Sequence, residues 1–233
     1  MEIPFGSLAA AVVFACAYLV GGGFGASEAG ERFWSRRRFL SAAAGISVAY
    51  IFIDVLPELE FQRKVVVKAA GEGLLFAEQR IYMLALLSFV VIYGLEHMVL
   101  VTRGRRRDTV AAGEADAVFW LQLAGYAAYS ALIGYLVIER AERGVLPLVA
   151  YTFAMAVHFL IVDHALDEEH GRAYRLLGRW LLAASVLAGW LFGVVAPLSE
   201  VAVARLFAVL AGGVVITSLR AELPDDREGR FWP

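Results

Sequence analysis

The chain has 233 residues, of which 60% are hydrophobic, with a mean hydropathy of +0.66 and a formal net charge of -2. This composition excludes an ordinary soluble domain and indicates an integral membrane protein whose main partner is the lipid bilayer. The small net charge gives no indication of a nucleic-acid partner, and none is expected. The one cysteine, Cys16, excludes an internal disulfide and a cysteine-based metal cluster.

Apolar runs long enough to cross a bilayer follow one another along the chain. A helix needs about 20 apolar residues to span the hydrocarbon core. Charges, glycines and prolines divide the sequence into seven predicted spans: 5–25, 36–57, 80–102, 117–139, 145–166, 176–197 and 200–221. The predicted fold is therefore all-α, a polytopic membrane protein forming one helical bundle over residues 1–233. The charged and apolar segment 59–79 is predicted to lie along the outer interface.

Basic residues collect in alternate loops. One side of the predicted bundle carries most of them: Arg36, Arg37, Arg38, Arg103, Arg105, Arg106, Arg107, Arg172, Arg175, Arg179, Arg227 and Arg230. The other side carries fewer: Arg63, Lys64, Lys68, Arg80, Arg140 and Arg143. Because basic loops remain in the cytoplasm, we expect the N-terminus outside and the C-terminus inside, in the inner membrane of a cell.

Two distant stretches share one pattern. Ala-Gly at 44–45 is followed twelve residues later by Leu-Pro-Glu at 56–58, and Ala-Gly at 211–212 is followed at the same offset by Leu-Pro-Asp at 223–225. Transporters built from two inverted halves show such paired, interrupted helices. The pattern predicts that the helix ending at Pro57 and the helix ending at Pro224 form an inverted repeat.

Polar residues within the spans are the candidate functional residues, because an ionisable group in hydrocarbon costs several kcal/mol unless it faces the bundle interior. Asp54 and Glu58 lie one helical turn apart, and Pro57 between them is expected to kink or end the helix. Two carboxylates beside freed carbonyl groups suit a cation. The alternative is a helix end whose acids reach water.

The third and fifth spans add further candidates. Glu96 and His97 end the third span and point to different sides of the helix, so one of them could serve a pathway while the other, by preference His97, has an interfacial role. His158 is the deepest histidine, on a helical stripe with Met155, and is either a metal ligand or a hydrogen-bonded core imidazole. Asp163 is nearer the inner interface, where it could pair with an arginine such as Arg172.

The fourth span contributes Tyr126, Tyr129 and Ser130 as candidate pathway-lining residues, together with Glu58 and Met155. Its small residues, including Gly134, predict close helix approach. Packing is the simpler explanation for this span.

The order of these features resembles the ZIP family of divalent-metal transporters. The resemblance rests on Ala-Gly to Leu-Pro-Glu at 44–58, Gly-x-Glu at 94–96, a basic loop at 103–116, a histidine-led fifth span and Ala-Gly-Gly to Leu-Pro at 211–224. It implies eight spans and a metal path between the fourth and fifth helices. It also implies a divalent metal ion such as zinc as substrate. If a metal is bound within the membrane, we expect His158 as a ligand because it is the deepest imidazole, with Asp54, Glu96 and Asp163 as candidate oxygen ligands.

The departures from the family pattern fall on the metal-binding motifs. Tyr126-Ala-Ala-Tyr-Ser130 stands where ZIP proteins have a His-Asn-x-x-Asp motif, and only His158 remains of the His-Glu-x-x-His motif. Only nine residues follow Pro224, so we expect no eighth span after it.

Two further classes of function stay open. One is an intramembrane metal-dependent hydrolase using His97, His158, His164, Asp54 and Asp163, in which three ligands leave a position for water. The other is a structural or sensory membrane protein that transports nothing. We expect no enzymatic activity, and we leave open whether the chain forms a homodimer.

Overall fold

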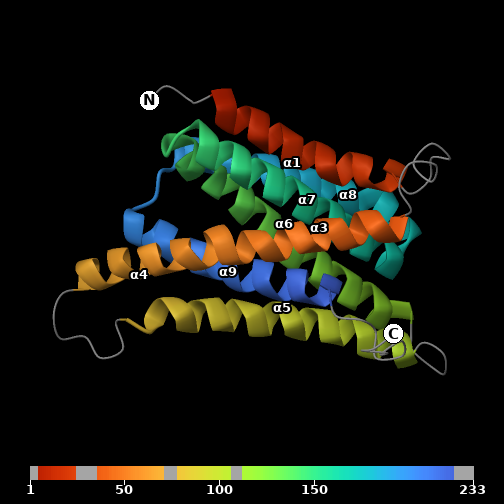
Figure 1. Ribbon diagram of the computed structural model, residues 1–233. Coiled ribbons are helices and arrows are strands. Elements are labelled where there is room, and N and C mark those ends of the chain that lie inside the picture. Colours follow the sequence, from red (N-terminus) through yellow and green to blue (C-terminus); the bar gives the residue numbers. More distant parts are fainter. Residues whose placement is uncertain (1–4, 25–35, 71–77, 106–111, 223–233) are drawn as a thin grey trace, which may run out of the picture.

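The computed structural model describes residues 5–24, 36–70, 78–105 and 112–222 (Figure 1). All regular structure within these ranges is helical. In chain order the elements are α1 (Phe5–Phe24), α3 (Arg36–Tyr50), η1 (Ile51–Val55), α4 (Leu56–Ala70), α5 (Arg80–Arg105), α6 (Ala112–Glu142), α7 (Val145–His170), η2 (Tyr174–Gly178), α8 (Arg179–Val195) and α9 (Glu200–Glu222).

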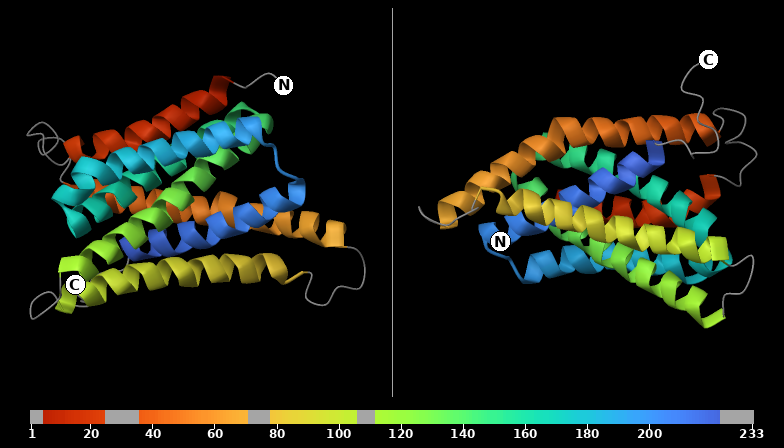
Figure 2. Two further views of the ribbon diagram at one scale, coloured as in Figure 1. Left: turned by 180° about the vertical axis from the view of Figure 1, so that it is seen from behind. Right: turned by 90° about the horizontal axis from the view of Figure 1, so that it is seen from below.

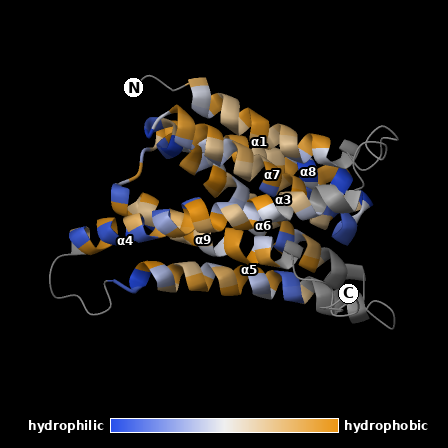
Figure 3. Ribbon diagram, viewed as in Figure 1, coloured by the Kyte–Doolittle hydropathy of each residue, from blue (hydrophilic) through white to orange (hydrophobic). Residues whose placement is uncertain are grey.

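The helices are those of a polytopic membrane protein. Six are long and apolar enough to span a bilayer, and the first helix adds a shorter apolar stretch, Phe5–Gly21. Large apolar side chains such as Leu86, Phe153 and Leu191 are exposed on the outer surface, where lipid would cover them. Figure 3 shows hydrophilic residues gathering at the two ends of the bundle. The predicted all-α fold is confirmed.

Successive spans run in opposite directions and bring alternate connections to opposite ends (Figures 1 and 2). We call the end where α6 finishes and α7 begins the Glu142 end, and the end where α7 finishes the His170 end. The most buried spans are those of α6 and α9. In their most apolar stretches 56% and 61% is buried, against 22% in α5. The bundle is therefore organised around α6 and α9.

The predicted second span, which begins with α3, does not end at Pro57, contrary to the prediction. The π-helical segment η1 and then α4 continue it to Ala70, so residues 59–70 prolong this span and do not form a separate interfacial segment. In a regular helix the ring of Pro57 would meet the carbonyl of Ile53. The Leu56 N–H donates instead to Ile51 five residues back, and this wider turn, directly before the proline, relieves the conflict.

The inverted repeat stays a prediction. The α3–α4 helix runs toward the Glu142 end and α9 runs away from it, as inversion requires (Figure 1). However, Gly45 faces open space, whereas Gly212 packs against the Ala85 carbonyl of α5. Pro224 lies outside the described residues.

Glycines allow α6 and α8 to approach closely. A Cβ added to Gly134 would collide with the Val186 carbonyl of α8, and one added to Gly189 would collide with the Ala131 carbonyl of α6. Backbone therefore meets backbone where these two helices cross, as in the small-residue interfaces of membrane helices. The close approach predicted for the fourth span is confirmed at Gly134.

Candidate functional site

Three helices bring polar groups to a buried point around His158, in the middle of α7. The imidazole is 1% exposed. Its Nε2 lies 3.4 Å from the Tyr129 hydroxyl of α6 and 3.5 Å from the Thr217 hydroxyl of α9. Both distances are long for hydrogen bonds, and Thr217 also donates to the Gly213 carbonyl at 2.8 Å. The imidazole is thus only weakly satisfied.

The other ring nitrogen of His158 has no hydrogen-bond partner among the described residues. The same is true of the Ser218 hydroxyl, next to Thr217 in sequence. A buried polar atom without a partner costs about 1–3 kcal/mol. Such an atom in the middle of a membrane bundle is a candidate contact for a ligand.

Two other predicted pathway residues lie near the middle of the bundle. The Ser130 hydroxyl is 2.9 Å from the Tyr18 hydroxyl of α1, and both residues are fully buried. Met155 is buried in the hydrophobic core, within a turn of His158. Ser130 therefore joins α1 to α6 through a hydrogen bond, and Met155 contributes packing.

A group of five charged residues and one glutamine lies toward the Glu142 end, and we call it the Glu58 cluster. Its members come from η1, α4, α6 and the turn after α6: Asp54, Glu58, Gln62, Glu139, Arg140 and Arg143.

Arg140 is the most buried cation of the Glu58 cluster, with a side chain that is 5% exposed. It donates to Asp54 at 3.2 Å and to Glu58 at 3.5 Å. Its guanidinium also lies over the rings of Tyr151 and Phe207, at 5.6 and 5.4 Å from their centroids. One arginine of α6 therefore ties the α3–α4 helix to α7 and α9, and both carboxylates are neutralised.

Arg143 supplies a second positive charge to the Glu58 cluster. It forms a two-point ion pair with Glu58, with one distance of 2.8 Å, and a further pair with Glu139 at 2.5 Å. Burial opposes the charge of Arg143, but its hydrogen bonds with Glu58 and the negative charge of Glu139 prevail and hold its pKa above the ordinary value. Gln62 completes the cluster by donating to Glu58 at 2.6 Å.

A second group lies toward the His170 end, and we call it the Asp163 cluster. Its members are Asp163, Asp167, Tyr174, Arg175 and Arg179. Asp163 is 1% exposed and accepts from Arg179 at 2.7 and 3.2 Å and from Tyr174 at 2.9 Å. Its partner is therefore Arg179 and not the expected Arg172. The spacing across the π-helical turn of η2 brings Arg179 back toward α7.

Each cluster adjoins a π-helical segment. Asp54 lies within η1, while η2 begins at Tyr174 and Arg179 directly follows it. A π turn replaces regular hydrogen bonds with looser ones, and such turns are frequent at functional sites. The two ends of the bundle thus share one design, an ion-pair cluster beside an irregular turn.

We expect Tyr174→Phe to lower the free energy of unfolding by about 1.5–3 kcal/mol, because the buried Asp163 carboxylate loses a hydrogen bond. Tyr82→Phe is the matched control, since the Tyr82 hydroxyl donates to Glu60 on the exposed surface, and its effect should be near zero. Unfolding in mixed micelles measures both. Equal losses would contradict the assigned role of Tyr174.

The predicted metal ligands are not brought together. Glu96 accepts from Tyr126 at 2.8 Å, while Asp54 and Asp163 belong to the two separate clusters. Within the described ranges, no three His, Cys, Asp or Glu side chains are placed to hold a metal ion. The assignment of His158, Asp54, Glu96 and Asp163 as ligands stays a prediction.

The sequence alone indicates no site role for Arg140, Arg143, Arg179, Tyr174 or Thr217. The three arginines resemble loop charges that set the orientation in the membrane. One signal was available for Arg140 and Arg179, because each borders an apolar run. Their partners could not be identified, since they lie 82 and 16 residues away in sequence.

Fold and site together define a polytopic helical membrane protein with a polar centre and charged clusters toward both ends. No family model, curated protein or solved structure matches the chain.

Proposed function

We propose that this protein is a ZIP-like membrane transporter of the cell's inner membrane that moves a small cation, with a divalent ion such as zinc as the substrate. The observation that carries the proposal is the buried His158 imidazole, which lies between the two charged clusters and has one nitrogen without a hydrogen-bond partner in the described part of the chain. An imidazole in mid-membrane is costly without a function.

The described conformation fits a transporter that is closed at both ends. The carboxylates of Asp54, Glu58 and Asp163 are occupied by arginines. A cation could recruit them only after a cluster opens, and the π turns beside each cluster are the natural places for that movement. Opening one cluster at a time would give alternating access to His158.

The proposed orientation places the Glu142 end outside and the His170 end in the cytoplasm. It follows from the larger number of arginines near the His170 end, at positions such as 36–38 and 172–179.

A structural or sensory protein without transport is the second candidate. The pairing of the buried carboxylates with arginines favours it, because such networks also hold helices in a unique arrangement. The intramembrane hydrolase would need two further protein ligands beside His158 to hold a metal.

Zinc entry into vesicles containing the purified protein and a zinc-sensitive dye tests the proposal. We expect His158→Ala to lower the rate at least about tenfold, because it removes the one imidazole in the polar centre. His164→Ala, on the same helix but with a side chain 22% exposed beside Glu168, should leave the rate nearly unchanged. Absence of zinc entry with the unmodified protein would reject transport and favour the second candidate.

A further inference from the structure

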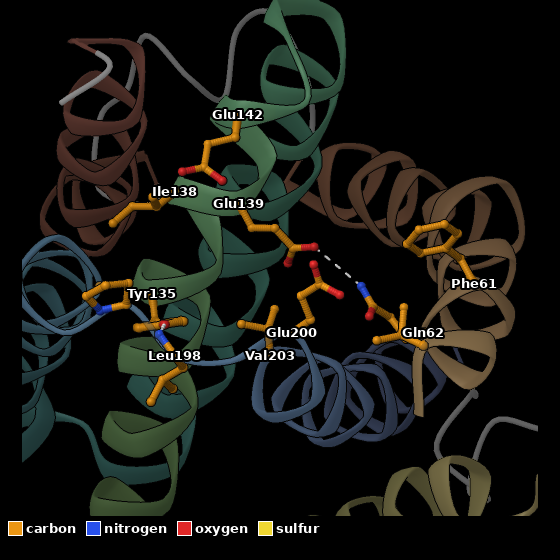
Figure 4. A pocket seen from close by; sticks show the side chains of 12 residues that line it. Phe61, Gln62, Tyr135, Ile138, Glu139, Glu142, Leu198, Glu200 and Val203 are labelled. Atoms are coloured by element: carbon orange, nitrogen blue, oxygen red, sulfur yellow. Dashed lines mark hydrogen bonds between the residues drawn. The ribbon is translucent and has the colours of Figure 1, made fainter. Parts of the chain in front are cut away.

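A cavity of about 340 Å³ lies at the Glu142 end, apart from the polar centre around His158. Three glutamates from two helices line it: Glu139 and Glu142 of α6 and Glu200 of α9. Figure 4 shows these side chains around the cavity, with the Gln62 amide hydrogen-bonded to Glu139. The volume is within the range of small-molecule sites.

The charges in this cavity are only partly neutralised. Glu139 is paired with Arg143 at 2.5 Å. No basic side chain among the described residues lies within ion-pair distance of Glu142 or Glu200, and both are exposed. The cavity therefore has an excess of negative charge, which attracts a cation.

The remaining walls are largely apolar and include two aromatic rings. Phe61, Tyr135 and Ile138 contribute to them. The face of Phe61 already contacts one cation of the protein, since the Arg143 guanidinium lies 5.4 Å from its ring centroid. Such walls suit an apolar body or an alkylated ammonium group more than a hydrated inorganic ion.

The arrangement of the three glutamates also argues against a chelated metal. Although they line one cavity, they do not form a group that could hold a metal ion. A larger cation, attracted by the negative charge without being chelated, fits this arrangement of carboxylates.

We propose that the cavity binds an organic ammonium ion with an apolar body. Glu142 and Glu200 supply the negative charge, and Phe61 and Tyr135 contact the apolar part. This binding requires neither zinc nor transport, so it stands independently of the proposed function.

Benzyltrimethylammonium is a suitable probe, and titration calorimetry of the full chain in neutral detergent at low salt measures its affinity. We expect saturable binding to the unmodified protein that weakens about tenfold in Glu142→Gln/Glu200→Gln. The matched control is Glu168→Gln, which removes an exposed carboxylate of α7 at the His170 end and should leave the affinity unchanged. Benzenesulfonate, an anion of similar shape, should not bind.

A second variant tests the cavity while retaining its charges. Val203→Phe places a larger side chain in the cavity wall and should lower the affinity for the probe by a similar factor. Matching elution volumes and thermal transitions establish that each variant is folded. Absence of saturable binding to the unmodified protein, or unchanged affinity in both folded variants, would overturn the proposal.

The ammonium group could belong to a free amine or to a lipid headgroup. Repeating the titration in nanodiscs of phosphatidylethanolamine and of phosphatidylglycerol separates these sources. Because the anionic phosphatidylglycerol surface concentrates the cationic probe, the titrations are made at high salt and the binding of Glu142→Gln/Glu200→Gln in the same membrane is subtracted. After this subtraction, weaker probe binding in phosphatidylethanolamine alone identifies a competing headgroup, and equal affinities identify a free amine. Absence of probe binding in both membranes would show that the site is not accessible in a bilayer and would overturn the proposal.

Discussion

Arg140→Met is expected to lower the free energy of unfolding by about 2–3 kcal/mol, less than the about 3–5 kcal/mol typical of a fully buried ion pair, because the Asp54 side chain is 33% exposed. Methionine replaces the aliphatic stem of the arginine by an apolar chain of similar length but removes the cation between Asp54 and Glu58. Arg143 still compensates Glu58, so the deficit should fall mainly on Asp54. Unfolding in mixed micelles at neutral pH measures the loss.

Lys64→Met provides the control for the Arg140 prediction. Lys64 is on α4, and its side chain is 68% exposed and 3.9 Å from Glu60. Exposed pairs of this kind contribute about 0–1 kcal/mol. If Arg140→Met is no more harmful than Lys64→Met, Arg140 does not hold the Glu142 end together.

The second large effect is expected for Gly189→Ala. The added methyl group would collide with the Ala131 carbonyl, which is backbone and cannot turn away as a flexible side chain can. Helices α6 and α8 must separate to accommodate it, at a cost of about 3 kcal/mol. The same unfolding measurement detects the loss.

Gly94→Ala is the matched control for Gly189→Ala. Gly94 is also within a helix, but a Cβ there meets nothing within 4 Å. Since alanine favours helix over glycine by about 0.8–1 kcal/mol, this variant should be slightly stabilised. If the free energy of unfolding falls in Gly189→Ala and rises in Gly94→Ala, the contact between α6 and α8, and not helix propensity, determines the effect at Gly189. A stabilised Gly189→Ala variant would contradict the close approach of these helices.

In the proposed transporter, the glycine contacts between α6 and α8 and the ion pairs of the Glu58 cluster have different mechanical roles. The glycines fix α6 against α8 by backbone packing, which offers no alternative arrangement at similar energy. The Glu58 cluster holds the α3–α4 helix to α6 through ion pairs, whose partners can exchange. Movement is therefore expected at the irregular turn η1 before it is expected between α6 and α8.

The amino-acid sequence by itself determined the all-α membrane fold and nearly all of the spans, because crossing a bilayer requires a local run of apolar residues that can be counted along the chain. It also indicated the burial of His158, the deepest histidine of its apolar run. It did not indicate the burial of Glu58 and Asp163, for which a helix end reaching water and a place near the inner interface were expected. Hydropathy could not reveal that the helix continues past Pro57, because the π turn that accommodates the proline is a feature of backbone geometry.

Only the tertiary structure decided which polar groups meet. Asp54 and Asp163 were grouped by sequence as ligands of one metal, yet Asp54 is paired with Arg140 and Asp163 with Arg179 in separate clusters. Likewise, Tyr129 and Thr217 meet His158 because α6, α7 and α9 pack together. Such pairings depend on the direction, rotation and depth of whole helices, which are set by packing against neighbours and not by the order of residues within any one span.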